Sequence, residues 1–538
     1  MITLRALARQ AVRIGAAAGL ASLGLASLGL AAAPQPAGAS TYTSISGSGS
    51  SWASVALDQW SSNVRQNGLV VNYNPDGSAA GRQDYINDQV DFTGSDPPFR
   101  DGQDELGGTG AENAGKYGFS YVPDTAGGTA FMYHITVAGH LITNLRLRPL
   151  TIMKIFTGTI TNWDNKQITR DYGAQLPNLP ITPVIRADGS GATFFLTRWM
   201  EHLDPSLWNA FCRRVHPGIR LPCPQTEFYP PNFGNAKAEN GSTNVANYIT
   251  SSYGNGAIGY DEYAYALNSH YPVVAVANPA GYWTLPKASN VAVALTKAVI
   301  NETKSSVNFL QQNLDHVYTF RDPRSYPLSS YSYLIVPRQA RGTPAPPLEF
   351  ASPAGKGRSL STFIDYFLCA GQAHIAELGY SPLPLNLVKG GLLQTDFIPG
   401  HISGPNLRTL AGCANPTFTN GILTLLKNAP QPSPCQKVGE PLNCVVRNGK
   451  ATTPGSGNSG NGKKGHSASA STGSGITGTT GTTGTTGTTG GQVTGQVINL
   501  AASQSSQVPL AVVTALGILA AVVTPPALAA WLRRRRRA

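Results

Sequence analysis

Residues 46–52 have the sequence SGSGSSW and lead into a predicted helix over 53–64. A β-branched run at 69–73 (LVVNY) then predicts a strand. Small residues let a backbone approach a ligand closely, and the N–H groups at a helix N-terminus attract anions. The stretch therefore predicts an anion-binding loop inside an alternating α/β unit. A serine-rich helix cap is the simpler alternative.

This alternation of short strands and longer helices continues from residue 41 to about residue 400. Further strands are predicted at 257–260 (AIGY) and 273–277 (VVAVA). Such alternation is typical of α/β layers. About 360 residues exceed what one hydrophobic core holds, so two lobes are expected.

A second polar loop, 186–193 (RADGSGAT), precedes a helical stretch at 194–200. It repeats the anion-binding pattern and adds Arg186, whose planar guanidinium suits tetrahedral oxyanions. Asp188 could hold that guanidinium in place. The alternative is a surface salt bridge beside a capped helix.

A third loop, 91–98 (DFTGSDPP), places Asp96 at the end of a strand-like run. A buried carboxylate can accept a hydrogen bond from a protonated oxyanion, such as phosphate, and repels fully ionised sulfate. The alternative is an ordinary turn aspartate before proline.

Taken together and in order, these loops resemble the phosphate-specific ABC transporter substrate-binding family. The resemblance covers about 45–391. Six segments carry it: 47–52 (GSGSSW), 91–96 (DFTGSD), 155–163 (IFTGTITNW), 186–191 (RADGSG), 256–260 (GAIGY) and 379–384 (GYSPLP).

The resemblance implies an α/β, two-lobed periplasmic-binding-protein fold of type II, with the ligand in the interlobe cleft and the second lobe at about 128–270. It implies no catalytic residue, metal or cofactor. Carried over by position, it assigns phosphate-binding roles to a hydroxyl (Ser51), a backbone N–H (Trp52), a helix-start hydroxyl (Ser78), a proton-sensing acceptor (Asp96), a charge partner (Arg186) and a second-lobe clamp (Ser190, Gly191, Ala192).

Two of these positions depart from the family pattern. Trp52 replaces the usual phenylalanine, which a backbone contact should tolerate. Ala192 stands where a hydroxyl residue is usual, so one hydrogen bond worth about 1 kcal/mol is expected to be lost. Thr193 is a candidate to compensate for it.

Both ends of the chain are predicted to be targeting segments. Residues 1–39 have basic residues, an apolar run at 14–33 and small residues before a cleavage site after Ala39, which predicts a signal peptide. An uncleaved anchor is the alternative. Residues 508–532 are apolar and uncharged, which predicts a transmembrane helix, followed by a basic cytoplasmic tail at 533–538. A hydrophobic C-terminal core helix is the alternative.

The region between the binding domain (40–400) and this helix divides into a Cys/Pro-rich extension (401–450) and a Gly/Thr/Ser-rich linker (451–507) without enough apolar residues to fold. An even number of cysteines in an exported chain favours disulfides over a zinc site. Proximity in the sequence favours the pairs Cys212–Cys223, Cys369–Cys413 and Cys435–Cys444 among fifteen arrangements.

The net charge of +12 belongs mostly to the two ends, where 8 of the 40 Lys and Arg residues lie; 32 remain against 28 acidic residues. Nucleic-acid binding is therefore not indicated. Without HExxH or a GxSxG motif in the folded region, a phosphatase is not indicated either.

We expect extracellular capture of inorganic phosphate and its delivery to an ABC transporter permease. A surface-anchored sensor or scavenger without a permease, or a protein that binds sulfate or molybdate, is the alternative.

Overall fold

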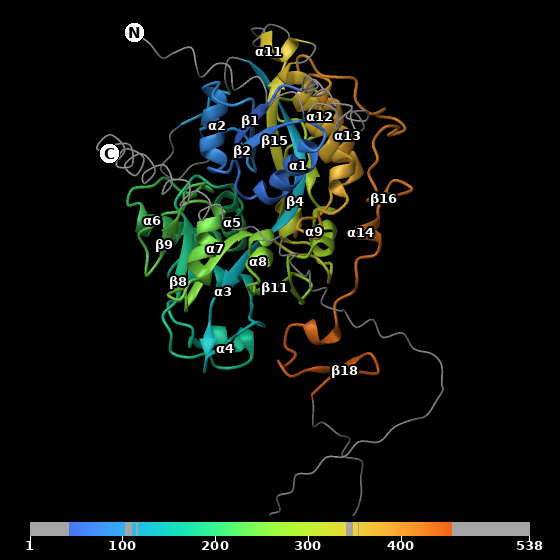
Figure 1. Cartoon of the computed structure of the whole chain (residues 1–538). Coiled ribbons are helices and arrows are strands. Elements are labelled where there is room, and N and C mark those ends of the chain that lie inside the picture. The colour runs from blue at the N-terminus through green and yellow to red at the C-terminus, as the bar shows by residue number, and fades with distance from the viewer. Residues whose placement is uncertain (1–41, 103–109, 115–116, 340–347, 353–354, 454–538) are drawn as a thin grey trace, which may run out of the picture. The chain divides into compact units, whose positions relative to one another are not determined.

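The computed structural model describes residues 42–102, 110–114, 117–339, 348–352 and 355–453 (Figure 1). The predicted signal peptide, transmembrane helix and basic tail, and the linker from residue 454, lie outside these ranges. Among the residues described, none of the helices has the length and apolar character needed to cross a bilayer.

An eight-stranded mixed sheet forms the centre of the fold. The strands, in spatial order, are β2 (Val71–Asn74), β1 (Ile45–Gly49), β3 (Phe92–Ser95), β15 (Ser329–Arg338), β4 (Gly118–Tyr133), β10 (Ala257–Glu262), β8 (Thr182–Arg186) and β9 (Lys237–Glu239). β1 is parallel to β2 and β3, and β8 is parallel to β9 and β10. β4 is antiparallel to both of its neighbours.

β4 connects the two lobes. Its residues 118–128 pair with β15, and its residues 129–133 pair with β10. β1, β2, β3 and β15 thus belong to a first lobe and β8, β9 and β10 to a second, as β4 passes from one to the other (Figure 1). The predicted two-lobed α/β fold is confirmed.

Helices cover the sheet of each lobe. In the first lobe α1 (Ser54–Arg65) buries Leu57, Trp60 and Val64, and Trp60 stacks on Phe367 at a centroid distance of 5.1 Å. The other first-lobe helices are α2 (Ser78–Ile86), α11 (Leu348–Ala351), α12 (Lys356–Leu368), η1 (Ala370–Gln372) and α13 (Leu385–Thr395). The helices between β4 and β11 are α3 (Pro149–Phe156), α4 (Lys166–Tyr172), α5 (Gly191–Leu203), α6 (Pro205–Val215), α7 (Gly241–Thr250) and α8 (Tyr263–Asn268).

Shorter elements complete this part. They are the three strands β7 (Arg146–Leu147), β11 (Ala275–Ala277) and β12 (Trp283–Thr284), the pairs β5 (Thr136–Val137) with β6 (His140–Leu141) and β13 (Val299–Ile300) with β14 (Gln312–Asn313), and the helices α9 (Ala288–Leu295) and α10 (Asp315–Tyr318). The predicted strand at 273–277 is shorter in the structure, because residues 273 and 274 make only irregular contacts with β4.

The Cys/Pro-rich extension contacts both lobes. Cys369–Cys413 attaches its start beside α12, and Arg146 of the second lobe donates to the carbonyl of Glu440 at 2.6 Å. Its elements are β16 (Phe418–Thr419), β17 (Ile422–Leu423), α14 (Thr424–Lys427), η2 (Pro434–Gln436), β18 (Val445–Arg447) and β19 (Lys450–Thr452). β19 carries regular structure past the predicted boundary at residue 450.

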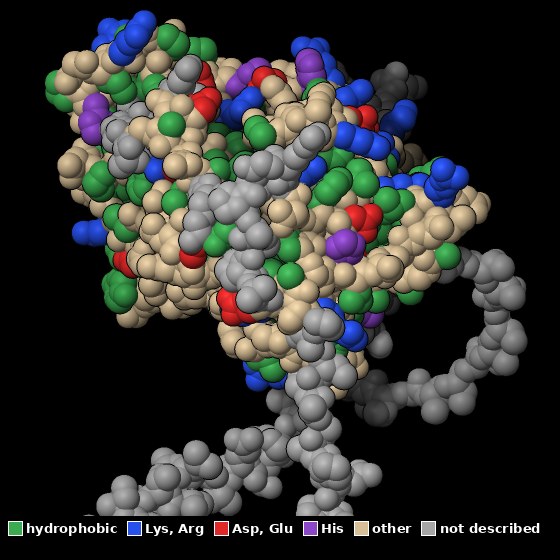
Figure 2. Space-filling model, turned by 90° about the horizontal axis from the view of Figure 1, so that it is seen from above, with side chains coloured by type: hydrophobic (Ala, Val, Ile, Leu, Met, Phe, Trp, Pro, Cys, Tyr) green, Lys and Arg blue, Asp and Glu red, His purple; other side chains and the backbone are tan. Residues whose placement is uncertain are grey.

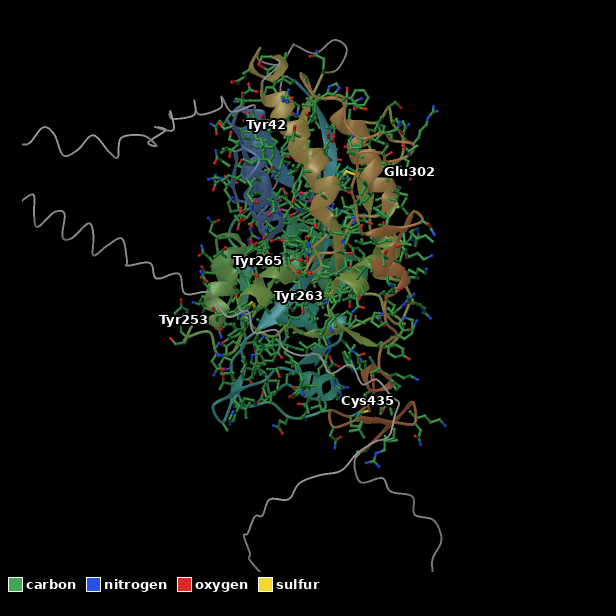
Figure 3. The ribbon with its side chains drawn as sticks, turned by 45° about the vertical axis from the view of Figure 1, so that its right-hand side comes forward. Tyr42, Tyr253, Tyr263, Tyr265, Glu302 and Cys435 are labelled. Atoms are coloured by element: carbon green, nitrogen blue, oxygen red, sulfur yellow. A yellow bond between two sulfur atoms is a disulfide. The ribbon has the colours of Figure 1, made fainter. Side chains whose placement is uncertain are left out.

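All three disulfides predicted from proximity are present. They join Cys212 to Cys223, Cys369 to Cys413 and Cys435 to Cys444. Figure 3 shows the last of these beside the β18–β19 hairpin. The zinc alternative for these six cysteines is therefore wrong.

The face shown in Figure 2 has basic, acidic and apolar side chains interspersed among neutral atoms. This agrees with a chain in which only 13% of residues are charged. On that face the polar character comes largely from neutral groups.

Candidate anion-binding site

The backbone at the end of β1 lies very close to the backbone of β3, as the glycines of this segment predict. Gly49 has a φ of +127°, and a Cβ there would lie 2.1 Å from the carbonyl oxygen of Gly94 on β3. Only glycine fits that position. The next two residues, Ser50 and Ser51, therefore leave the sheet at its edge, directly before α1.

The hydroxyl groups of the two serines bond mainly to residues outside α1, although Ser50 also accepts a long hydrogen bond from the N–H of Ala53 at 3.4 Å. The hydroxyl of Ser50 donates to Asp96 at 2.9 Å, and the hydroxyl of Ser51 lies 2.7 Å from that of Ser242 and accepts from Arg186 at 2.8 Å. α1 has no side-chain cap. A helix-capping role alone therefore does not account for these residues, because their shorter hydrogen bonds go to Asp96, Ser242 and Arg186.

Trp52 is a core residue. Its side chain is buried, its ring meets Tyr380 edge-on at 5.8 Å, and its carbonyl accepts from the hydroxyl of Tyr380 at 2.7 Å. Its indole therefore packs in the protein interior, and only the backbone of this residue is suited to the predicted role.

Asp96 lies directly after β3 among three serine hydroxyls. Ser332 on β15 donates to it at 2.6 Å, Ser50 at 2.9 Å and Ser78 at 3.3 Å. Burial raises the pKa of Asp96 to about 6, although these hydroxyls and Arg186 oppose the increase. A carboxyl group in this environment can carry or accept a proton close to neutral pH, which an exposed turn aspartate does not do.

Ser78 is the first residue of α2, at the contact between the lobes. A Cβ on the preceding Gly77 would lie 2.5 Å from Asp188, and the N–H of Ala79 donates to the carbonyl of Gly189 at 3.1 Å. The start of α2 thus meets the loop between β8 and α5. A pocket lined by Ala79 of α2, Asp188 of this loop and Phe228 of the segment before β9, among other residues, lies beside the site.

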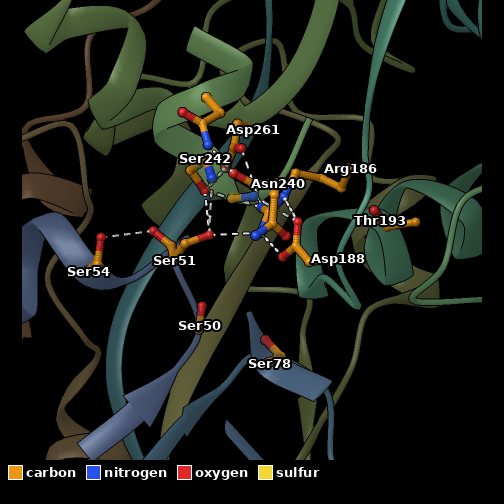
Figure 4. Close-up of polar contacts among 12 residues, drawn as sticks. Ser50, Ser51, Ser54, Ser78, Arg186, Asp188, Thr193, Asn240, Ser242 and Asp261 are labelled. Atoms are coloured by element: carbon orange, nitrogen blue, oxygen red, sulfur yellow. Dashed lines mark hydrogen bonds and ion pairs between the residues drawn. The ribbon is translucent and has the colours of Figure 1, made fainter. Parts of the chain in front are cut away.

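Arg186 ends β8 and is only 2% exposed, so the surface-salt-bridge alternative is wrong. It forms a two-pronged ion pair with Asp188 and donates to Asp261 at 3.4 Å and to Ser242 at 3.2 Å (Figure 4). Burial alone would lower the pKa of Arg186, but the carboxylates of Asp261 and Asp188 hold it above its ordinary value.

Ser190, Gly191 and Ala192 form the N-terminus of α5, which faces Asp96. Ser190 is the N-cap without a side-chain cap bond, and a Cβ on Gly191 would lie 2.1 Å from Asp96. The first N–H groups of a helix have no partner within it, so they point toward this carboxyl group and its surroundings. The hydroxyl of Thr193 is bonded to Tyr260 at 2.7 Å, which gives no support for its compensating role.

The structure brings Ser51, Ser78, Asp96, Arg186 and the α5 N-terminus together from both lobes. Sequence reasoning missed Ser242, Asp261 and Ser332 as neighbours of this site. Ser242 follows a glycine at the start of α7, a signal of the same kind as the loops above. Asp261 follows the 256–260 segment directly, whereas Ser332 lies in a buried stretch of β15 without any local signal. Within the described ranges, no three His, Cys, Asp or Glu residues are grouped to hold a metal.

The fold is that of a two-lobed periplasmic-binding protein. The chain belongs to the PBP superfamily, whose domain matches residues 34–370.

The curated relatives it matches include "Phosphate-binding protein PstS" of Xylella fastidiosa (strain Temecula1 / ATCC 700964), with 27% identity over 347 residues, 64% of this chain and 83% of the relative. "Phosphate-binding protein PstS 2" of Mycobacterium tuberculosis is 26% identical over 326 residues, 59% of this chain and 76% of the relative.

Solved structures with similar topology include a "Phosphate-Binding Protein from Stenotrophomonas maltophilia", with 16% identity, a TM-score of 0.46, and coverage of 69% of this chain and 99% of that one. A "Putative Phosphate ABC Transporter Substrate-Binding Protein with Bound Phosphate from Clostridium perfringens" is 17% identical, with a TM-score of 0.40 and coverage of 63% and 100%.

Proposed function

We propose that this protein captures inorganic phosphate outside the cell and delivers it to an ABC transporter permease. One arrangement carries the proposal: a buried carboxyl group, Asp96, lies among serine hydroxyls of the first lobe and faces Arg186 and the α5 N-terminus of the second. The names of the curated relatives, which are phosphate-binding proteins, point the same way.

The proposed mechanism is capture without chemical change. The anion enters between the lobes, which close by a hinge motion of the kind known for two-lobed binding proteins. Ser51, Ser78 and the N–H groups of residues 191 and 192 replace its water. Asp96 accepts the proton that phosphate carries and sulfate lacks.

The binding step is tested by calorimetric titration of the purified, phosphate-stripped protein with phosphate and with sulfate. We expect a dissociation constant of about 1 µM or lower for phosphate, which corresponds to a binding free energy of roughly −8 kcal/mol. We expect no measurable heat with sulfate. Absence of phosphate binding by the folded, stripped protein would overturn the proposal. Equal binding of both anions would retain an oxyanion site but remove the role given to Asp96.

Delivery to a permease is a separate step with its own test. Cells lacking this protein should lose high-affinity uptake of radiolabelled phosphate, and the intact gene should restore it. Normal uptake without the protein would favour the sensor or scavenger.

The proposed tether, 508–532, predicts that a chain truncated after residue 507 appears in the medium, while the full chain stays with the membrane fraction.

A further inference from the structure

Arg186 faces two carboxylates, of which only Asp188 was expected from the sequence. Asp261, at the end of β10, is 6% exposed and lies 3.4 Å from an Nη1 nitrogen of Arg186. Ser242 donates to the other oxygen of Asp261 at 2.8 Å, and so does the backbone N–H of Glu262. This carboxylate is thus held in place from α7 and from its own strand.

The guanidinium of Arg186 has five N–H donors, and each has an acceptor in the structure. Nε donates to Asp188, Nη2 to Asp188 and Ser51, and Nη1 to Ser242 and Asp261 (Figure 4). An anion must therefore replace an existing partner to contact Arg186. Two carboxyl groups, Asp188 and Asp261, oppose its single positive charge. Burial raises the pKa of Asp261, and Arg186, the N–H of Glu262 and the hydroxyl of Ser242 act against that rise by stabilising the carboxylate.

The other titratable groups around Asp261 do not restore a positive balance. Glu262, the next residue along β10, is buried, and burial raises the pKa of its carboxyl group well above the ordinary value. The titratable groups that face Asp261 or its partner Arg186 are Arg186, Asp188, Tyr260, Glu262, Tyr265, Tyr380 and, from the first lobe, Asp96. The loop before α1 contributes the hydroxyl of Ser51, α1 that of Ser54 and α7 that of Ser242.

A site of this kind treats singly and doubly charged anions differently. Serine hydroxyls and the α5 N-terminus are dipoles that stabilise an anion without cancelling the surplus carboxylate charge. Because Coulomb repulsion grows with each added charge, the second negative charge of an anion is disfavoured most. Near neutral pH, inorganic phosphate exists as both H2PO4− and HPO4²−.

We propose that Asp261 is a specificity-determining residue that makes this site select H2PO4− over HPO4²−. The inference rests on the proposed function. Above neutral pH the dominant solution species must gain one proton on binding: HPO4²− and H+ combine, and the bound species is H2PO4−. Asp261 acts through its charge on Arg186 and the cleft and need not contact the anion.

The test compares the full-length wild type with Asp261→Asn, which keeps the size and the acceptor oxygen and removes the charge. Phosphate affinity is measured at about pH 6 and about pH 8. The wild type should bind more weakly at the higher pH, and the variant should gain about tenfold or more in affinity there and less at the lower pH. Asp58→Asn, on the exposed face of α1, is the matched control and should behave as wild type.

The inference is overturned if Asp261→Asn binds phosphate no more tightly than wild type. It is also overturned if the ratio of the variant's affinities at the two pH values equals that of wild type. If Asp261→Asn does not fold, wild-type titrations in buffers of different ionisation enthalpy give the number of protons taken up. Close to one proton at about pH 8 supports the inference, and none overturns it. A wild type that binds no phosphate at either pH refutes the proposed function itself, which separates the two failures.

Discussion

Arg82 on α2 and Glu227, in the segment before β9, form a buried two-pronged ion pair between the lobes, at 2.8 and 2.6 Å. The carbonyl of Glu227 also accepts from the N–H of Ser190, the N-cap of α5, at 3.0 Å. Arg82 further donates to Ser95, the residue before Asp96, at 2.8 Å. One ion pair thus links the strand end that carries Asp96 to the helix N-terminus that faces it.

Glu227→Gln should therefore shorten the lifetime of the closed, phosphate-bound form. Removing one charge leaves buried Arg82 with Glu112, at 2.8 Å, as its remaining carboxylate partner, and breaking a buried pair typically costs about 3–5 kcal/mol. Because part of that loss affects open and closed forms alike, we expect phosphate dissociation to accelerate by about ten- to a hundredfold, measured by stopped-flow.

Glu302→Gln is the control, because Glu302 is exposed on a loop (Figure 3) and should leave the dissociation rate unchanged. If Glu227→Gln releases phosphate at the wild-type rate, the ion pair does not stabilise closure.

Asp96→Asn should weaken discrimination between phosphate and sulfate. The amide can donate a hydrogen bond where the carboxylate only accepts, so the repulsion of fully ionised sulfate is removed. Competition titrations should show phosphate affinity falling and sulfate binding becoming measurable. Asp58→Asn again serves as the control, and unchanged selectivity in Asp96→Asn would exclude the proposed role of this carboxyl group.

Asp365→Asn should stabilise the protein at alkaline pH. Burial, with a contribution from nearby Asp396, raises the pKa of Asp365 to about 7 from an ordinary value of 3.8. The folded state thus holds this proton more tightly than the unfolded state, so stability falls as pH rises from about 4 to about 7 and the full penalty remains above that.

The asparagine variant lacks this penalty. We expect its free energy of unfolding to exceed that of wild type by about 1–3 kcal/mol at about pH 8 and by less at about pH 5, measured by urea denaturation. An equal difference at both pH values would show that the carboxyl group does not titrate as described.

Replacing Cys369 and Cys413 by serine should lower stability by about 2–4 kcal/mol. This disulfide closes a loop with a sequence separation of 44 and attaches the extension to the first lobe. The matched double variant at Cys435 and Cys444, with a separation of 9, should cost less, because a short loop constrains the unfolded chain less. Thermal unfolding of both variants, with the other disulfides intact, provides the comparison, and the reverse order would contradict it.

Local sequence was sufficient for much of the fold. Helix α1 lies within one residue of its predicted bounds, and the strand expected at 257–260 is part of β10. The spacing of the six cysteines predicted all three disulfides. These features depend on order along the chain: glycine in a turn, apolar residues on one face, and cysteines that pair with the next cysteine in the sequence.

The sequence alone also indicated that Asp96 and Arg186 belong to polar loops of one anion site, but not which residues surround them. Ser332 lies 236 positions from Asp96, and Asp261 lies 75 positions from Arg186. Only the tertiary structure brings them together, because the order of strands β3, β15 and β4 and the parallel pairing of β8 with β10 determine which strand ends are adjacent. No local pattern encodes that order, so the charge balance around Arg186 was decided by the packing of distant strands.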